Sequence, residues 1–332
     1  MGIKPFVLLL CIIISVQHYV YTQNYVLEKN IVYKLDDNLS DYEKEKCKLD
    51  ISYKKSGSLF PVIIYLHGGG LTSGTKQFIS SYLEEDFVNV AVGYRLSPDV
   101  KCPAYIDDVS AAVSWVWNNI EKYGGDKNKI FLIGHSAGAY LTAMIALDKK
   151  YLEKYAISPD YLAGYVCLSG QMTTHYTILK ERGIIVSNDS KFVDEFAPLF
   201  HVREIKPFII FVIGERSLDL VGRFEQNYEI VEKLRTYNNR TCLWEFLKTN
   251  HDISMINAAT RRLLPMFNDN DFEITDFYGE EFNAISKLID YKKIEAIYTV
   301  MGVRLNKKDV NNISSGLYVV FDGNKYEKVY KQ

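Results

Sequence analysis

A serine lies at the centre of the segment Gly134-His-Ser-Ala-Gly138, which fits the pattern G-x-S-x-G. The apolar residues 130–133 before it predict a buried strand, and residues 139–147 after it predict a helix. A serine at such a turn is held exposed, and the flanking glycines are needed because side chains there would collide with the strand and the helix. The helix also points its free N–H groups and the positive end of its dipole at the serine. We therefore interpret Ser136 as a nucleophile.

A glycine loop precedes this serine in the sequence. Residues 60–66 are apolar on both faces, which is typical of a strand in the middle of a sheet that helices cover on both sides, and they end in His67-Gly-Gly-Gly70. Consecutive glycines cost backbone entropy, so they suit a loop whose backbone must approach a ligand closely. A loop at this place is the expected source of N–H groups that stabilise an oxyanion. The alternative is a flexible turn without chemistry.

A serine nucleophile needs a base that accepts its proton and a carboxylate that orients the base. In the G-x-S-x-G architecture the order along the chain is serine, acid, histidine. Three histidines follow the serine. His175 lies in the irregular segment 171–205, and His201 precedes the strand predicted at 207–213. His251 follows the last predicted strand of the core and is therefore the predicted base.

The acid is expected in the loop after the strand that ends at Ile213. This loop reads Gly214-Glu-Arg-Ser-Leu-Asp-Leu-Val221. We choose Asp219 as the acid and keep Glu215 in reserve. Asp252 is too close to His251 in the sequence to reach back to its ring easily, and we interpret it as a cap of the last helix.

The rest of the chain alternates between apolar runs and helical patterns, which predicts a mostly parallel sheet with right-handed crossovers and helices on both faces. Strands are predicted at 25–27, 31–35, 49–53, 60–66, 87–94, 130–133, 162–169, 207–213 and 241–247. Helices are predicted at 108–120, 139–147, 224–237 and 256–264. The segment 171–205 is the natural place for a small lid over a cleft.

The composition limits the classes of partner and the number of domains. The chain has 332 residues, of which 48% are hydrophobic, and a net charge of −2. This length suits one large α/β domain or two smaller ones. The charge implies neither a nucleic-acid partner nor a polybasic membrane contact.

The N-terminus has the features of a secretory signal peptide, which we place at residues 1–22. Lys4 precedes the apolar run 5–16, which is too short to span a membrane comfortably; an uncleaved anchor is the alternative. Secretion is also consistent with the four glycosylation sequons, at Asn38, Asn188, Asn239 and Asn312.

The cysteines give a further expectation. Cys47 and Cys102 can pair in an oxidising compartment. Cys167 and Cys242 lie in strand-like runs and are predicted to be buried free thiols.

Taken in order, the motifs resemble the H-G-G-G lipase/esterase group of the α/β-hydrolases, nearest to the kynurenine formamidase-like and ferulic-acid-esterase-like carboxylesterases. The resemblance covers roughly residues 45 to 265. Its motifs are Leu49-Asp-Ile, His67-Gly-Gly-Gly70, Tyr94-Arg-Leu-Ser-Pro98, Pro103-Ala-x-x-x-Asp108, Tyr123-Gly-Gly-Asp126, Gly134-His-Ser-Ala-Gly138, Lys150-Tyr-Leu152, Leu168-Ser-Gly170 and Asn250-His-Asp252.

The resemblance implies roles for individual residues. Ser136 would be the nucleophile and His251 the base, and no metal or organic cofactor would be required. The N–H groups of the oxyanion hole would come from Gly69, Gly70 and Ala137. Gly68 would shape the loop, His67 and Asp108 would be structural, and Asp107 would be a surface residue.

The chain departs from this family in three ways. The family usually places its acid where this sequence has Ser217, so Asp219 requires a shifted loop. Kynurenine formamidases are usually cytosolic, whereas this chain has a secretory N-terminus. Residues 266–332 have no counterpart and form an extension with a helical stretch at 280–298 and a hairpin at 316–330 around Asp322-Gly323.

The sequence therefore predicts a secreted serine hydrolase with a catalytic domain at 23–265, which cleaves small-molecule carboxylic esters through an acyl-enzyme. Hydrolysis of an aryl formamide is one alternative. The other is a binding or adhesion protein on a hydrolase fold whose activity has decayed.

Overall fold

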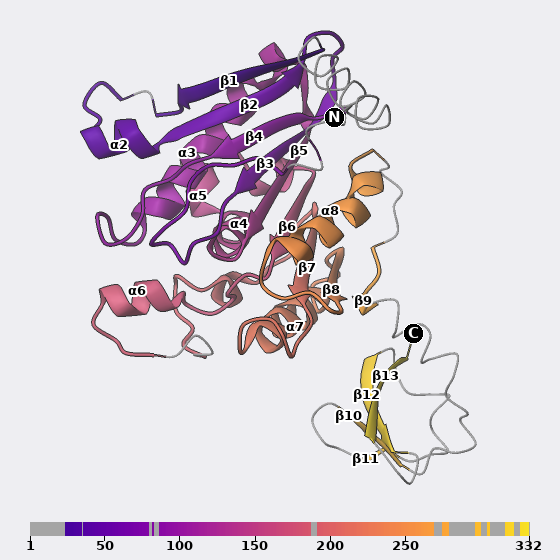
Figure 1. The fold of residues 1–332 in the computed structure, drawn as a ribbon. Helices are drawn as coiled ribbons and strands as arrows, with labels where there is room; N and C mark the ends of the chain where they lie inside the picture. The colour runs from indigo at the N-terminus through magenta and orange to yellow at the C-terminus, as the bar shows by residue number, and fades with distance from the viewer. Residues whose placement is uncertain are drawn as a thin grey trace, which may run out of the picture.

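A nine-stranded sheet forms the centre of the computed structural model (Figure 1), which describes residues 24–34, 36–79, 82, 86–186, 191–268, 274–278, 296–299, 304–305, 316–321 and 326–331. The strand order is β1-β2-β4-β3-β5-β6-β7-β8-β9. β2 is antiparallel to both of its neighbours, and every other pair is parallel. The strands are β1 (Tyr25–Val32), β2 (Lys48–Lys54), β3 (Phe60–Leu66), β4 (Val88–Val92), β5 (Gly125–His135), β6 (Gly164–Leu168), β7 (Phe208–Gly214), β8 (Thr241–Phe246) and β9 (Phe277–Tyr278).

Helices cover both faces of this sheet, as the continuous apolar strands predict. The α-helices are α2 (Asp41–Lys46), α3 (Ala104–Asn119), α4 (Ala137–Leu147), α5 (Lys150–Glu153), α6 (Tyr176–Glu181), α7 (Arg223–Arg235) and α8 (Ile253–Asn268), with 3-10 turns at η2 (Ile120–Tyr123), η3 (Pro159–Tyr161) and η4 (Pro198–His201). None of the helices in the described part of the chain has the length and apolar character needed to cross a membrane.

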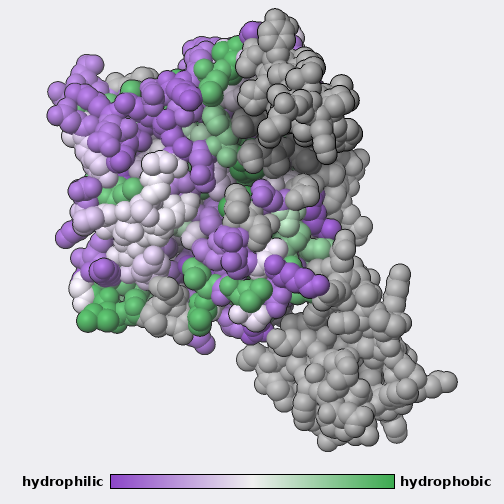
Figure 2. All heavy atoms as spheres, in the orientation of Figure 1, coloured by the Kyte–Doolittle hydropathy of each residue, from purple (hydrophilic) through white to green (hydrophobic). Residues whose placement is uncertain are grey.

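The core consists of two layers, because side chains alternate along a strand. Ile64, Leu132 and Phe211 pack with α3, α4 and α7 on one face. Ile63, Phe131 and Ile210 pack with α8 on the other face. The predicted α/β-hydrolase architecture is confirmed. In the view of Figure 2, hydrophilic residues dominate over β1, β2 and α2, and apolar residues gather near α6.

Several predicted elements differ from the structure, and three of the differences change the architecture or its boundaries. The two short strands at 25–27 and 31–35 form one strand, β1, whose register shifts between Glu28 and Ile31. The helix expected at 108–120 begins earlier, at Ala104. The strand at 241–247 is not the last of the sheet, because β9 pairs with β8 beyond it. β9 has only two residues, which is too short for a recognisable alternation.

The C-terminal region contains a separate four-stranded antiparallel sheet with the order β11-β10-β12-β13. Its strands are β10 (Ala296–Thr299), β11 (Arg304–Leu305), β12 (Gly316–Phe321) and β13 (Tyr326–Lys331). The pairing of β12 with β13 confirms the predicted hairpin, although its turn at Asp322-Gly323 lies outside the described residues. The helix predicted at 280–298 is wrong at 296–298, where β-branched and aromatic residues favour a strand; residues 280–295 lie outside the described part.

The cysteines do not form the expected pair. Cys47, Cys102, Cys167 and Cys242 are all free thiols. Burial raises the pKa of Cys47 and of Cys102 to about 12, and their side chains contact Tyr33 and Tyr105 respectively rather than each other. Cys167 and Cys242 are buried free thiols as predicted.

The two glycosylation sequons in the described residues differ in the exposure of their asparagine. Asn38 is exposed. Asn239 is buried: its Oδ1 accepts from the N–H of Ile205 at 2.8 Å, and its Nδ2 donates to the carbonyl of Arg203 at 2.8 Å. A glycan on Nδ2 would break this contact, so Asn239 is not a glycosylation site of the folded protein. Asn188, Asn312 and the predicted signal peptide at 1–22 lie outside the described residues.

Candidate active site

Ser136 lies on a tight turn between β5 and α4. Its backbone has φ +54° and ψ −114°, which an L-residue rarely adopts. A Cβ on Gly134 would lie 2.1 Å from the carbonyl oxygen of Gly138, and one on Gly138 would lie 2.2 Å from that of Leu66. The two glycines therefore let the strand, the helix and the end of β3 pack closely around the serine.

His251 connects Ser136 to Asp219. Its Nε2 lies 2.8 Å from Ser136 Oγ, and its Nδ1 lies 2.7 Å from Asp219 Oδ1. The three residues follow β5, β8 and β7, and the carboxyl ends of parallel strands meet at one edge of a sheet. The fold thus brings together the three side chains that the sequence singled out. In space the histidine lies between the serine and the acid.

Asp219 is held as a carboxylate. Its side chain is only 2% exposed, and burial alone would raise its pKa. The hydrogen bond and charge of His251 oppose burial, as do the N–H groups of Leu220 at 2.7 Å and Gly214 at 2.9 Å. Together these contacts lower the pKa of Asp219, so the carboxylate is charged and fixed in orientation at neutral pH.

The reserve acid, Glu215, lies elsewhere. Its carboxylate accepts from Ser217 Oγ at 2.6 Å and from the N–H of Lys248 at 2.8 Å, and these hydrogen bonds lower its pKa. It therefore fixes the loop that carries Asp219. Asp252 directly precedes α8 and is exposed.

Ser169 is a second serine in contact with His251, and the sequence reasoning did not assign it a role. It directly follows β6 with φ +51°. Its Oγ lies 2.8 and 2.9 Å from the two oxygens of Asp219 and 2.8 Å from His251 Nδ1. Ser169 thus lies on the acid side of the imidazole and Ser136 on the opposite side. The signal was its position at the carboxyl end of a core strand, in Leu168-Ser-Gly170.

The glycine loop lies directly beside the nucleophile, since a Cβ on Gly68 would be 3.2 Å from Ser136 Cβ. Gly69 and Gly70 have φ of +111° and +62°. Within the described residues, neither of their N–H groups donates to a protein acceptor. Ala137 is the first residue of α4, so its N–H has no partner inside the helix. Free N–H groups therefore flank Ser136.

The segment 171–205, predicted as a lid, packs against this loop. Thr177 Oγ1, on α6, donates to the carbonyl of Gly70 at 2.6 Å. A Cβ on Gly70 would lie 2.2 Å from the hydroxyl oxygen of Tyr176. The first part of the segment is mostly buried, whereas Ile185 and Phe192 expose apolar surface beside α6. The segment thus packs against the glycine loop and helps to position it.

His135 binds the backbone of His251, the predicted base. Its Nε2 donates to the carbonyl of His251 at 3.0 Å, and the two rings lie 5.0 Å apart. Burial, followed by the charge of His251, lowers the pKa of His135 to about 4. The ring is therefore neutral near pH 7 and acts as a hydrogen-bond donor to the backbone of His251.

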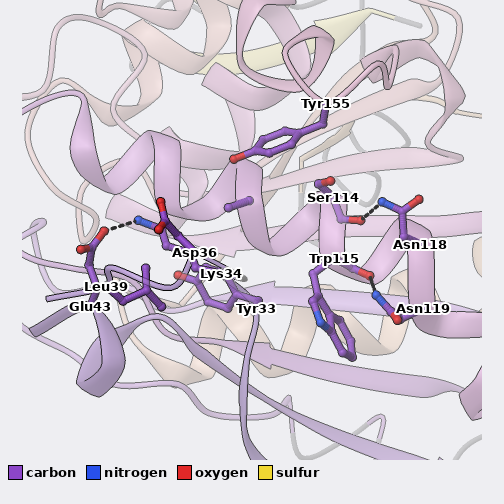
Figure 3. A pocket seen from close by; sticks show the side chains of 11 residues that line it. Tyr33, Lys34, Asp36, Leu39, Glu43, Ser114, Trp115, Asn118, Asn119 and Tyr155 are labelled. Carbon is purple, nitrogen blue, oxygen red and sulfur yellow. Dashed lines mark hydrogen bonds and ion pairs between the residues drawn. The ribbon is translucent and has the colours of Figure 1, made fainter. Parts of the chain in front are cut away.

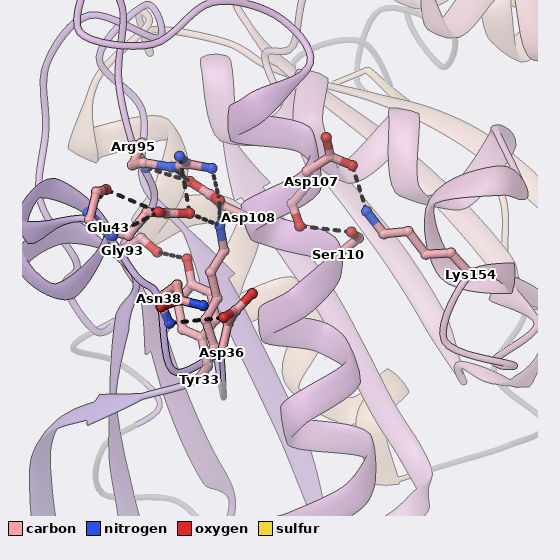
Figure 4. Close-up of polar contacts among 12 residues, drawn as sticks. Tyr33, Asp36, Asn38, Glu43, Gly93, Arg95, Asp107, Asp108, Ser110 and Lys154 are labelled. Carbon is pink, nitrogen blue, oxygen red and sulfur yellow. Dashed lines mark hydrogen bonds and ion pairs between the residues drawn. The ribbon is translucent and has the colours of Figure 1, made fainter.

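His67 and Asp108 have the contacts of structural residues. His67 is buried and stacks on Tyr94 at 4.3 Å, and its Nδ1 donates to the carbonyl of Gly68 at 2.7 Å. Asp108 is fully buried and binds Arg95 through two hydrogen bonds of 2.7 and 2.8 Å (Figure 4). These contacts anchor the start of the glycine loop and the segment after β4.

Asp107, next in sequence to Asp108, points away from this network. It forms an ion pair of 2.5 Å with Lys154, and both side chains are partly exposed (Figure 4). This is the surface position that the resemblance implied.

A pocket of about 530 Å³ lies at another place, between the segment after β1 and helix α3 (Figure 3). Tyr33, Trp115 and Tyr155 are among its lining residues, and no triad residue is. Among the described residues, no group of three or more His, Cys, Asp and Glu side chains could hold a metal ion.

Comparisons with known proteins agree with this geometry. The BD-FAE family model matches residues 49–163. Esterase LipC of Mycobacterium tuberculosis is 28% identical over 221 residues, which cover 60% of this chain and 54% of the relative. The probable isoprenylcysteine alpha-carbonyl methylesterase ICMEL1 of Arabidopsis thaliana is 24% identical over 308 residues, which cover 85% and 62% respectively. The chain spans about half the length of several curated relatives that it matches.

Solved structures show the same fold. A truncated carbohydrate esterase from gut microbiota superposes with a TM-score of 0.58 at 16% identity, over 74% of this chain and 97% of that one. The apo form of Thermogutta terrifontis esterase 2 superposes with a TM-score of 0.56 at 20% identity, over 72% and 94%. The sheet, the serine turn, the glycine loop and these similarities together show that the chain has the α/β-hydrolase fold and is similar to these esterases.

Proposed function

We propose that this protein hydrolyses carboxylic esters, with Ser136 as nucleophile, His251 as general base and Asp219 as the acid that orients it. The observation that carries the proposal is the continuous line of hydrogen bonds Ser136–His251–Asp219, of 2.8 and 2.7 Å, beside unpartnered backbone N–H groups. The names of the related proteins, which are esterases, support the same reaction class.

The position of each serine on the imidazole favours Ser136 over Ser169 as the nucleophile. Ser136 Oγ faces Nε2, which accepts its proton while Nδ1 donates to Asp219. Ser169 Oγ lies on the Nδ1 side, where the ring proton already points at the carboxylate. Only Ser136 stands at a helix N-terminus beside the glycine loop. Ser169 therefore positions the acid and the base.

The reaction follows from this arrangement. Ser136 Oγ attacks the ester carbonyl carbon while His251 takes its proton. The N–H groups of Gly69, Gly70 and Ala137 bind the oxyanion, and the loss of one such donor typically costs about 3 kcal/mol of transition-state stabilisation. His251 then gives the proton to the leaving alcohol, which leaves an acyl-enzyme. Water, activated by His251, attacks the acyl-enzyme and releases the acid.

The test compares the two serines directly. We expect Ser136→Ala to abolish hydrolysis of p-nitrophenyl acetate and butyrate, and Ser169→Ala to retain measurable turnover. A fluorophosphonate probe, followed by peptide mass spectrometry, should place its adduct on Ser136. Undiminished hydrolysis by Ser136→Ala, or an adduct on Ser169, would end this assignment.

Two alternatives remain as outcomes of further measurements. A substrate panel that includes N-formylkynurenine separates esterase from arylformamidase activity. A binding protein without activity would leave the folded chain unlabelled by the fluorophosphonate. Two features motivate this alternative, the acid displaced in the sequence and the C-terminal extension; the contact of Asp219 with His251 argues against the first of them.

We further propose that the protein is secreted after cleavage of residues 1–22. The cationic start and short apolar run support this. Expression in a eukaryotic host tests it: the medium should contain a chain that lacks the first 22 residues and carries a glycan at Asn38. Retention of the full chain in the membrane fraction would favour the uncleaved anchor.

A further inference from the structure

A guanidinium is buried close to the triad without a partner. Arg223 is the first residue of α7 and is only 1% exposed. Its Nε and Nη1 atoms have no hydrogen-bond partner, and no ion pair of the described residues includes it. A buried charge of this kind is costly unless it is paired. It also adds to the positive end of the α7 dipole, so the site is suited to an anion.

The residues around Arg223 belong to the active site. Its charge interacts with Asp219 and Tyr176, and it contributes to the lowered pKa of His135. His135 precedes Ser136, and the hydroxyl of Tyr176 reaches Gly70. Burial lowers the pKa of Arg223 to about 10, so the side chain stays charged at neutral pH.

The nearby carboxylate of Asp219 acts on this charge only through space, because the structure shows no hydrogen bond between the two side chains. Asp219 already accepts hydrogen bonds from His251, from Ser169 and from two backbone N–H groups. Its charge stabilises the imidazolium that forms during the reaction. A ligand that accepts hydrogen bonds from Arg223 and also carries a negative charge therefore matches this site best.

Further unpartnered donors lie close to Arg223. His175 Nδ1 accepts from the N–H of Thr177 at 3.2 Å, so the proton of the neutral ring is on Nε2, which has no partner. The Arg223 charge, together with burial, holds the pKa of His175 well below its usual value. Gln226, one turn after Arg223, accepts from the N–H of Met172 at 3.1 Å and leaves its Nε2 free.

These side chains come from helix α7 and from the segment between β6 and α6, and a hydrogen bond joins the two. Asn227 Nδ2 donates to the carbonyl of Gly170 at 2.9 Å, and its Oδ1 is an unpartnered acceptor. The contact joins α7 to the segment that leads from β6 to α6. The donors on both pieces thus have fixed positions, as a binding site requires.

We propose that Arg223, with His175 and Gln226, binds a free carboxylate on the ester substrate, so that the enzyme prefers esters whose acyl or alcohol part is negatively charged. This inference rests on the proposed esterase function and defines its substrate class. The ionised group places its charge against Arg223 while the ester carbonyl lies at Ser136.

Pairs of ester substrates with and without a free carboxylate test the proposal. In the acyl arm, mono-4-nitrophenyl glutarate is compared with 4-nitrophenyl valerate. In the alcohol arm, 3-butyryloxybenzoate is compared with phenyl butyrate. We expect a higher kcat/KM for the charged member in one arm, and a fall of roughly 10- to 100-fold for that member alone in Arg223→Met, the usual effect of losing a charged hydrogen-bond partner.

Arg216→Gln is the matched control, because Arg216 lies on the loop that leads into α7 but is partly exposed and pairs with Glu225. This variant should leave kcat/KM unchanged for both the charged and the neutral substrate. If wild type shows no preference in either arm, or if Arg223→Met lowers charged and neutral substrates equally, the proposal is overturned. Hydrolysis of neutral esters without a preference would refute only this inference, whereas a protein that hydrolyses no ester refutes the esterase function.

A binding measurement on the wild type decides the matter if Arg223→Met does not fold or if no ester is hydrolysed. Glutarate and valerate are titrated into the full-length protein by calorimetry. Tighter binding of glutarate, weakened by raising the salt concentration, supports the carboxylate site. Equal affinity for the two acids, or no binding of either, means that ordered water satisfies Arg223 and overturns the proposal.

Discussion

The hydroxyl of Ser169 bridges Asp219 and His251, and this contact leads to a prediction about turnover. Ser169→Ala should lower kcat about tenfold with little change in KM, because the imidazole and carboxylate lose a shared partner while the substrate contacts stay intact. Steady-state kinetics on p-nitrophenyl butyrate measures both constants. Ser217→Ala is the control, since Ser217 contacts only Glu215 in this loop. An unchanged kcat would show that Ser169 has no positioning role.

The glycine loop gives a second prediction at the scale of single residues. Gly70→Ala should lower kcat about 100-fold, because its new methyl group collides with the Tyr176 hydroxyl and displaces an oxyanion donor. Tyr176→Phe removes the colliding oxygen, so the double variant should recover part of the activity. Gly183→Ala is the control, since Gly183 has φ +76° but nothing within 4 Å of its added Cβ. A double variant no better than Gly70→Ala would contradict the prediction.

At the scale of elements, the edge of the sheet depends on the short segment around β9. Asp276 Oδ1 accepts from Arg235 Nη2 at 2.5 Å and from the N–H of Leu243 at 2.9 Å. Trp244 Nε1 donates to the carbonyl of Thr275 at 2.9 Å. These contacts lie beyond residue 265, where the sequence placed the end of the catalytic domain.

Asp276→Ala should therefore lower the free energy of unfolding by about 2 kcal/mol, since it leaves the backbone N–H of Leu243 without its acceptor and Arg235 with only its ion pair to Glu232. Urea denaturation followed by tryptophan fluorescence measures the change. Asp86→Ala, which breaks only an exposed ion pair with Lys54, should change the free energy by less than about 1 kcal/mol. Equal effects of the two substitutions would count against a structural role of β9.

The sequence predicted the central elements because their signals are local. Residues 60–66 and 207–213 are long apolar runs. The turn at Ser136 is flanked by glycines, which the close packing of strand and helix requires. β9 could not be predicted, since Phe277 and Tyr278 are held by distant partners and not by their own pattern. The same holds for Ser169 and Arg223, whose neighbours come from other strands and helices. Asp219 was chosen on loop position alone, and only the fold shows it beside His251.

At the scale of the whole molecule, the buried histidines lead to a prediction about acid stability. Burial lowers the pKa of His67, of His135 to about 4, and of His175 well below its usual value. In the unfolded chain each has a pKa near 6.5. The unfolded state therefore binds more protons below about pH 6.5, and the free energy of unfolding falls as pH decreases, by up to about 1.4 kcal/mol per pH unit for each histidine.

The contribution of His135 should stop falling near pH 4, where the folded form also takes up its proton. The lowered pKa of Asp219 acts in the same direction at still lower pH, because protonating this carboxylate removes its hydrogen bonds. Urea unfolding at intervals between pH 7.5 and 4.5 measures the slope, and His135→Asn should reduce it by about one proton. A stability that is independent of pH in this interval would refute the prediction.

The strand order of the sheet has a consequence for synthesis of the chain. From β5 outward, β6, β7, β8 and β9 join one edge in the order in which they are translated. His251 is 115 residues after Ser136. At about 5–20 residues per second, the base leaves the ribosome roughly 6 to 23 seconds after the nucleophile. A nascent chain thus carries its serine turn and glycine loop early, and under the proposed mechanism it can attack esters only when the last third of the sheet is added.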